Sequence, residues 1–477
     1  MFQTLLNIFR VPELRNKVLF TLFMLAIYRI GYHIPLPGVD QQQFAEMNKQ
    51  RQQSGEDTAA NRLANYVSLF SGGNLTQSTI FGLGIMPYIS ASIIFQLLTT
   101  VVPSVEKLQK EGETGRRKIQ EWTRYCTVPL CVIQAIFWLT YMSHGDHSLV
   151  QRRILNEYGI SFWVVGLCSL TAGGIFLMWL GEQIDEYGLG NGASLIILAN
   201  IVARMPGAVQ QLIAQTNLRA GVPDASRPIT PGKLIFLIAS FMFVVAGSIL
   251  ITQAQRRIPI QQAKHTRGRR IYGGQRQYLP LRVNHGGVMP IIFAQSLMLF
   301  PSVFFGWIAG FGIGTDPAAP GAAKVFGEIV RWLNYELGRG QFIYIMTESL
   351  MIYFFAYFWT TVQFQPKEMA QQLRDFGSFI PGLRPGKRTA DYLEKVMMRI
   401  TYVGAAFLCI IAVVPMAVQS SLNIPYQISA FLGGTGLLIV VSVALDMIQR
   451  IEANLLVRNY GGFLGGGGNK RIKGRQY

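Results

Sequence analysis

Ten long apolar runs constrain the fold of this chain more than any other feature of its sequence. A transmembrane helix needs about 20 consecutive, mostly apolar residues. The strands of a membrane barrel would instead alternate polar and apolar residues over about ten positions. The runs therefore predict an all-α polytopic membrane protein with ten transmembrane helices, near residues 18–36, 76–100, 121–142, 160–181, 193–214, 233–253, 288–309, 342–363, 396–417 and 429–448.

Composition agrees with a membrane protein. Only 14% of the residues are charged, whereas a soluble domain carries about 25%. The four cysteines lie in or beside apolar runs without metal-ligand spacing, so we expect small buried side chains at Cys126, Cys131, Cys168 and Cys409. We find no catalytic constellation, and we therefore expect no cofactor, no metal and no enzymatic activity.

Positive charge fixes the expected orientation. The formal net charge is +18, and most of the 43 Lys and Arg residues lie in the termini and in alternate loops. Cytoplasmic loops carry such an excess, so we expect both chain termini in the cytoplasm. Residues 1–17 predict a cytoplasmic amphipathic helix without a cleavage site for a signal peptide. Residues 449–477 predict a flexible basic tail.

A repeated six-residue box indicates two related halves. Residues 84–89 read Gly-Ile-Met-Pro-Tyr-Ile, and residues 287–292 read Gly-Val-Met-Pro-Ile-Ile. Each box lies at the second apolar run of a five-run half, with the halves over 18–217 and 218–448. An odd number of spans reverses the second half, so we expect inverted repeats around a central pore.

The boxes carry aliphatic side chains at the expected interface of the halves. Ile85 and Ile89 share one helical face, and Ile292 is the counterpart of Ile89 in the second half. An aliphatic constriction excludes water and ions by dewetting. Alternatively, these isoleucines only pack helix against helix. An ion-coupled solute transporter would need polar groups at midplane, yet Arg29, Glu348 and Asp446 lie near span ends. A structural or assembly factor without a pore would not need a short, non-spanning segment with a hinge at Gly72-Gly73.

Three further segments are candidates for function. Residues 62–74 form a short semi-apolar segment that breaks at Gly72-Gly73, too short to span the membrane. The basic loops 254–287 and 364–395 predict cytoplasmic projections, the first of them a hairpin. Both loops fit topology determinants, anionic-lipid contacts, or a docking surface for RNA or an acidic protein. The glycines of residues 186–194 follow no strand and precede no Lys, which argues against a phosphate loop.

Several motifs together resemble the SecY family, in its bacterial form, over nearly the whole chain. The resemblance is carried by Phe70-Ser71-Gly72-Gly73, residues 84–92, residues 111–118, Gly190-Asn191-Gly192, Gly268-Arg269-Arg270, residues 381–386 and residues 433–440. It implies the protein-conducting channel of the general secretion translocon, in the bacterial cell (inner) membrane. Such a channel passes secretory polypeptides and releases transmembrane segments sideways through a lateral gate between spans 2–3 and 7–8.

The resemblance also implies roles for individual residues. The pore ring would comprise Ile85, Ile89, Ile197, Ile292 and Ile439. The plug would include Tyr66, Leu69, Phe70, Ser71, Gly72 and Gly73. The lateral gate would carry Ser90, Ser92, Gln134 and Gln295. Docking of the SecA motor or the ribosome would use Arg256, Arg257, Lys264, Arg269, Arg270, Arg384 and Lys387. The small membrane subunits SecE and SecG, secretory and membrane polypeptides and anionic phospholipids are the further partners implied.

Overall fold

The computed structural model describes residues 12–37, 39, 79–143, 152–216, 229–262, 265–267, 270–272, 276–287, 289–310, 321–338, 341–422 and 435–464. The expected plug segment 62–74 and residues 1–11 of the expected N-terminal helix lie outside these residues.

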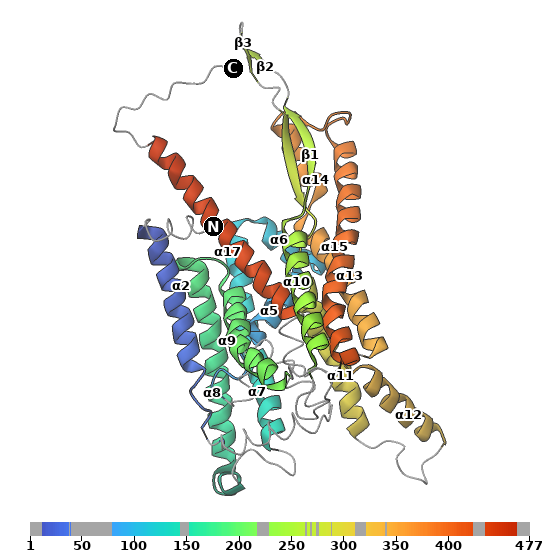
Figure 1. The fold of residues 1–477 in the computed structure, drawn as a ribbon. Coiled ribbons are helices and arrows are strands. Elements are labelled where there is room, and N and C mark those ends of the chain that lie inside the picture. The colour runs from blue at the N-terminus through green and yellow to red at the C-terminus, as the bar shows by residue number, and fades with distance from the viewer. Residues whose placement is uncertain are drawn as a thin grey trace.

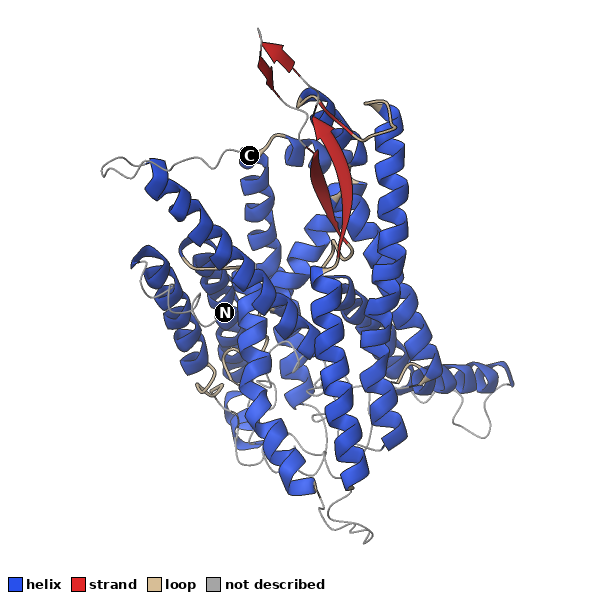
Figure 2. Cartoon of the chain, turned by 45° about the horizontal axis from the view of Figure 1, so that its top comes forward, coloured by secondary structure: helices blue, strands red, loops and turns tan. Residues whose placement is uncertain are grey.

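The described residues form a helical bundle from which a small β-structure projects at one end (Figure 1, Figure 2). The helices are α2 (Pro12–Gly31), α5 (Met86–Val101), α6 (Pro103–Lys110), α7 (Glu113–Ser143), α8 (Arg152–Tyr187), α9 (Gly192–Gln215), α10 (Pro231–Gln253), α11 (Met289–Gly310), α12 (Gly321–Glu336), α13 (Phe342–Gln363), α14 (Pro366–Asp375), α15 (Lys387–Leu422) and α17 (Thr435–Leu464). The strands are β1 (Gln255–Gln262), β2 (His265–Arg267), β3 (Arg270–Tyr272), β4 (Arg276–Arg282) and β5 (Ser378–Phe379).

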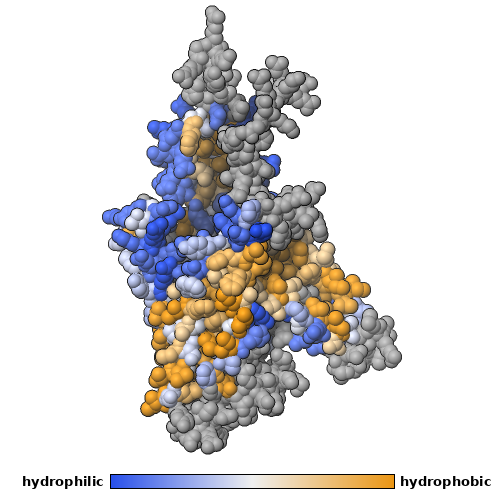
Figure 3. Space-filling model, turned by 90° about the vertical axis from the view of Figure 1, so that its left-hand side faces the viewer, coloured by the Kyte–Doolittle hydropathy of each residue, from blue (hydrophilic) through white to orange (hydrophobic). Residues whose placement is uncertain are grey.

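Each expected apolar run overlaps one of the described helices, but length and hydropathy single out a smaller set. Helices long and apolar enough to cross a membrane cover Gly159–Tyr187, Gly192–Gln215, Pro231–Gln253, Phe342–Asp375 and Lys387–Val414. α5 and α6 together form a sixth candidate, bent by 101° at the break between them. The chain is thus a multi-pass membrane protein. Figure 3 shows the apolar band of its surface below a hydrophilic end.

The expected span over residues 76–100 is wrong at its start. Residues 80–85 form turns, and helix α5 begins only at Met86. The physical reason is Gly84, whose φ of 58° lies in the left-handed region and cannot continue into a right-handed helix. Gly287 has the same φ of 58° two residues before the start of α11. The two sequence boxes therefore share one local conformation: a left-handed glycine followed by a helix with proline at its second position.

Helix packing follows the same plan in the two parts of the chain. In the first part, α2 packs on α8 and α9, α5 on α7, α7 on α8, and α8 on α9. In the second part, α10 packs on α15 and α17, α11 on α13, α13 on α15, and α15 on α17. Among the described residues, the two parts of the chain make their main helix contact between α9 and α17.

The two basic loops form one projecting unit. β1 and β4 pair as the expected antiparallel hairpin, and β5, from the second loop, pairs with the other edge of β1. Beneath this sheet, Ile258 and Leu281 pack against Ile380 and Leu393 in one buried cluster. The sequence patterns predicted two separate projections. The structure joins them because their apolar faces bury each other.

The C-terminal helix is longer than the last apolar run. α17 continues through Leu464, whereas we expected a flexible tail from residue 449. Ile451 is buried against Leu14 and Leu189, so this end of α17 packs on α2 and on the turn before α9. This packing gives the helix a buried face beyond the expected span, and tertiary packing supplies most helix stability in proteins.

Candidate functional site

Five buried isoleucines belong to the main hydrophobic cluster of the bundle. Ile85 precedes α5, Ile89 lies on α5, Ile197 on α9, Ile292 on α11 and Ile439 on α17. All five have exposed fractions of 8% or less and belong to one hydrophobic cluster. The structure therefore brings together the residues predicted for the pore ring. Whether they surround a translocating chain stays a prediction.

Backbone geometry places these side chains. Gly84 and Gly287 turn the chain so that α5 and α11 begin beside the cluster. At the start of α9, a Cβ on Gly192 would lie 2.0 Å from the carbonyl oxygen of Gly181, so only glycine permits this approach of α9 to α8. The backbone N–H of Gly192 also donates to Asp185 Oδ1 at 2.7 Å. This tight turn holds Ile197 within the cluster.

A polar vestibule opens next to the isoleucine cluster, at the end of the bundle that carries the hairpin. It has a volume of about 420 Å³. Leu195 and Met289 line it and also pack in or against the cluster. The rim draws residues from both parts of the chain, including Asn191, Arg282 and Asp446. A polar cavity thus borders the aliphatic cluster.

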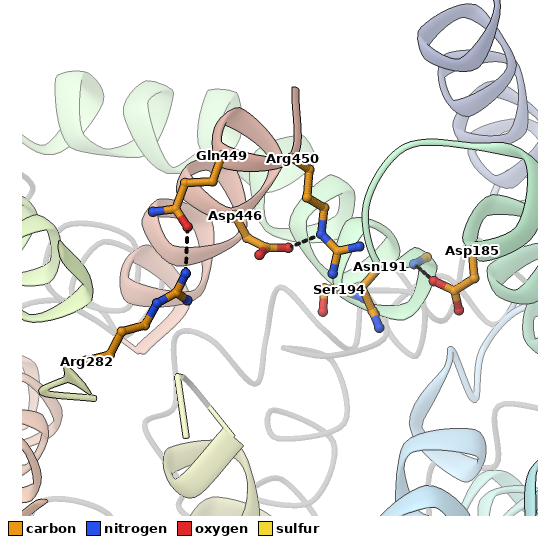
Figure 4. A network of polar contacts seen from close by, with 8 residues as sticks. Asp185, Asn191, Ser194, Arg282, Asp446, Gln449 and Arg450 are labelled. Atoms are coloured by element: carbon orange, nitrogen blue, oxygen red, sulfur yellow. Dashed lines mark hydrogen bonds and ion pairs between the residues drawn. The ribbon is translucent and has the colours of Figure 1, made fainter. Parts of the chain in front are cut away.

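The vestibule rim is held by polar contacts (Figure 4). Arg282 Nη2 donates to Gln449 Oε1 at 3.1 Å and connects the end of β4 to α17. On α17, Arg450 Nε donates to Asp446 Oδ2 at 2.8 Å. The backbone N–H of Ser194 donates to Asn191 Oδ1 at 3.0 Å and caps α9. The rim is therefore both polar and ordered.

His285 adds a neutral side chain to the vestibule. Burial lowers the pKa of this imidazole below its ordinary value. Its Nδ1 lies 2.7 Å from the carbonyl oxygen of Arg282, so Nδ1 carries the proton and donates. Because a lowered pKa keeps the ring uncharged at neutral pH, His285 adds hydrogen-bonding capacity without charge.

A lateral cleft of about 790 Å³ lies between α5–α7 and α13–α14. Its walls include Ser92 and Thr99 of α5, Thr123 of α7 and Met369 of α14. Three side chains line both the cleft and the vestibule: Gln96, Trp359 and Gln363. The two cavities therefore adjoin each other, which gives the vestibule a side branch between the two halves.

The predicted gate residues lie in different environments in the structure. Ser92 lines the cleft, while Ser90 and Gln134 are half-buried and are not among the residues lining the two cavities. Gln295 is buried, and its Nε2 donates to Oε1 of the buried Glu348 at 3.2 Å, which joins α11 to α13. The sequence patterns placed Glu348 near a span end and missed this contact. They also missed Trp359, because one aromatic among the many of residues 353–359 gives no signal of its own.

The predicted docking residues gather at the projecting end where the structure describes them. Arg256 and Arg257 on β1 are exposed, as are Arg384 and Lys387 near the start of α15. Lys264 and Arg269 lie outside the described residues, and no side chain is described for Arg270.

Within the described part of the chain, no group of three or more His, Cys, Asp or Glu side chains could hold a metal ion.

Comparison with known proteins gives consistent matches. A sequence model of the SecY family matches residues 79–448. The protein translocase subunit SecY of Thermotoga maritima is 37% identical over 477 residues, covering 100% of both chains. That of Thermus thermophilus is 40% identical, covering 98% of both, and that of Escherichia coli K12 is 38% identical, covering 94% of this chain and 93% of the relative.

Solved structures share the fold. A structure described as a protein-conducting channel aligns with a TM-score of 0.56 and 18% identity, covering 92% of each chain. Sec61 in a canine ribosome–channel complex aligns with a TM-score of 0.55 and 17% identity, again covering 92% of each chain. At these identities the likeness is one of fold.

Proposed function

This chain belongs to the SecY family, and from that premise we infer that it is the central protein-conducting channel of the general secretion translocon. It passes unfolded secretory polypeptides across the membrane and releases transmembrane segments sideways into lipid. Its role is that of a channel subunit and not of an enzyme. The observation that carries this function is the buried aliphatic cluster beside a polar vestibule.

An isoleucine ring suits a pore for polypeptides. Aliphatic contacts are not directional, so Ile85, Ile89, Ile197, Ile292 and Ile439 can surround any extended chain. Their branched side chains are stiff at χ1, which keeps the constriction defined. At rest, a constriction of this kind excludes water and ions by dewetting. We propose that residues 62–74 close the far side as the plug.

We further propose ten spans in two inverted five-helix halves. Support comes from the matching boxes with left-handed Gly84 and Gly287. It comes also from the packing plan: five helix pairs of the first half, α2·α8, α2·α9, α5·α7, α7·α8 and α8·α9, have counterparts in the second, α10·α15, α10·α17, α11·α13, α13·α15 and α15·α17. Inverted repeats place the functional path at their interface, where the isoleucines meet.

The lateral cleft supports a gate opposite the α9–α17 contact. With the halves joined there, opening would separate α5 and α7 from α13 and α14. A segment in the cleft could then choose between pore and lipid. In the bilayer, a Leu is favourable by about 0.3–0.6 kcal/mol and a central Lys costs about 2.5–3.5 kcal/mol. Segments of about 20 apolar residues would leave sideways.

Energy for transport must come from partners. We propose that the projecting unit with Arg256, Arg257, Arg384 and Lys387 docks the SecA motor or the ribosome, and that SecE and SecG complete the membrane complex. The basic surface would also contact anionic phospholipids. The proposed location is the bacterial cell (inner) membrane, with both termini and the projecting unit in the cytoplasm, as the positive-inside rule favours.

A photo-reactive probe at Ser92 should cross-link to the apolar signal segment of a stalled secretory chain. The reason is that Ser92 lines the cleft through which such a segment would pass. The measurement is the yield of adducts after illumination of the reconstituted channel with an engaged, stalled substrate.

Tyr125 provides the matched control, because it lies on α7 at 73% exposure and does not line the cleft. Adducts at Ser92 several-fold above those at Tyr125 are expected. Equal yields from both positions, with the substrate shown to be engaged, would count against a gate at this cleft.

A further inference from the structure

Helix α12 presents three chemically different faces. Lys324, Glu328 and Arg331 recur at helical spacing on one exposed face. Gly327 and Val330 are buried on a second face, against the bundle. The third face is apolar and exposed, with Val325 (57%), Phe326 (49%), Ile329 (49%) and Trp332 (54%). A helix wholly in water or wholly inside the protein would not need this third face.

The position of α12 limits what can cover that apolar face. The helix projects sideways from the bundle near the end opposite the β1–β4 hairpin (Figure 1, Figure 2). It packs on α11 and α13. α13 begins shortly after α12 ends, and its exposed stripe of Phe342, Met346 and Leu350 has the spacing of a lipid-facing surface. The apolar face of α12 thus lies on a helix that packs against α13, whose exposed stripe is suited to face lipid.

The aromatic residues and the charge balance agree with a membrane interface. Trp332 borders the charged face. The exposed Tyr335 lies on that face, between Glu328 and Arg331 in helical projection. Trp and Tyr favour this boundary, where the apolar ring meets lipid and the polar group meets headgroups. Two basic and two acidic side chains, including Glu336, balance within Lys324–Glu336. Binding would therefore depend on apolar burial rather than on anionic headgroups.

We propose that α12 is an interfacial helix that lies in the membrane surface opposite the hairpin, with Val325, Phe326, Ile329 and Trp332 in the boundary between headgroups and acyl chains. Its end is fixed to the bundle, because Leu337 packs with Met298 of α11 and Tyr344 of α13 in one buried cluster. Lipid contact at α12 therefore constrains the outer ends of α11 and α13. This inference does not depend on the channel function.

The test uses the full-length protein in phosphatidylcholine nanodiscs, with a genetically encoded environment-sensitive fluorescent residue at Ile329. Neighbouring Glu328 is the matched control on the charged face, and Leu350 is the reference for lipid contact. Quenching is measured with a phosphatidylcholine that carries a nitroxide high on its acyl chain, and separately with aqueous iodide.

We expect the nitroxide lipid to quench the Ile329 probe several-fold more than the Glu328 probe, with the reverse order for iodide. Adding phosphatidylglycerol should leave the ratio unchanged. Equal iodide quenching at both positions would place α12 in water and overturn the proposal. Protection of Ile329 from both quenchers would do so as well, since it would indicate a protein contact.

Discussion

Replacement of Ile85 and Ile292 together by asparagine should make the resting channel leak ions. Both side chains are at least 96% buried in the central cluster, one from each half. Burial of an isoleucine is worth about 1.5–3 kcal/mol. The two substitutions should lower the free-energy cost of wetting the constriction by about 3 kcal/mol. At about 1.4 kcal/mol for each factor of ten, this corresponds to a roughly hundredfold higher ion leak. Polar side chains at a dry constriction let water enter, and ions follow.

Single-channel conductance and ion flux from proteoliposomes measure this leak. Ile133→Asn is the control for a polar substitution on a spanning helix, because Ile133 lies on α7 at 61% exposure. Ile85→Val with Ile292→Val tests whether apolar character is sufficient, and this variant should stay closed. Unchanged conductance in the folded double asparagine variant would exclude a seal at these residues.

Arg384→Glu should strongly impair protein export while the channel remains folded. Arg384 is exposed in a rigid turn: Gly382 and Gly386 have φ of 85° and 111°, and the Thr389 hydroxyl donates to the Arg384 carbonyl oxygen at 3.0 Å. The turn joins the projecting unit proposed for docking. Hydrogen bonds to charged groups contribute about 1.5–3 kcal/mol, so reversing this charge should weaken partner binding about tenfold or more.

Arg374→Glu makes the same charge reversal at the end of α14, in the same loop but outside the turn. Export rates into vesicles that hold each variant, at limiting motor concentration, compare the two sites. We expect the rate to fall for Arg384→Glu and to change little for Arg374→Glu. Equal losses would indicate a general effect of positive charge, and normal export by Arg384→Glu would contradict docking at this turn.

The central cluster could be anticipated because its signal is local. The two Gly-x-Met-Pro boxes marked Ile85, Ile89 and Ile292, and the family resemblance added Ile197 and Ile439. All five lie in one buried cluster. Short motifs preserve such positions because a left-handed glycine and a proline fix where each helix begins.

Features that depend on contacts distant in sequence could not be anticipated. β5 has two residues, which are too few to predict a strand from sequence. They form a strand because they pair with β1 in the folded chain. The contact of Gln295 with Glu348 likewise requires α11 and α13 to be placed together. Helix α12 escapes prediction for another reason: its 16 residues are too short and too charged to stand out as a membrane span.

Cross-linking of a stalled secretory chain to the isoleucine cluster tests the proposed pore most directly. Photo-reactive probes would replace Ile85, Ile292 or Ile439, with Ile133 on the exposed side of α7 as control. Adducts to the translocating chain from the three cluster positions, and none from Ile133, are the expected result. With the stalled chain shown to be engaged, absence of adducts at all three cluster positions would contradict a polypeptide pore at this cluster.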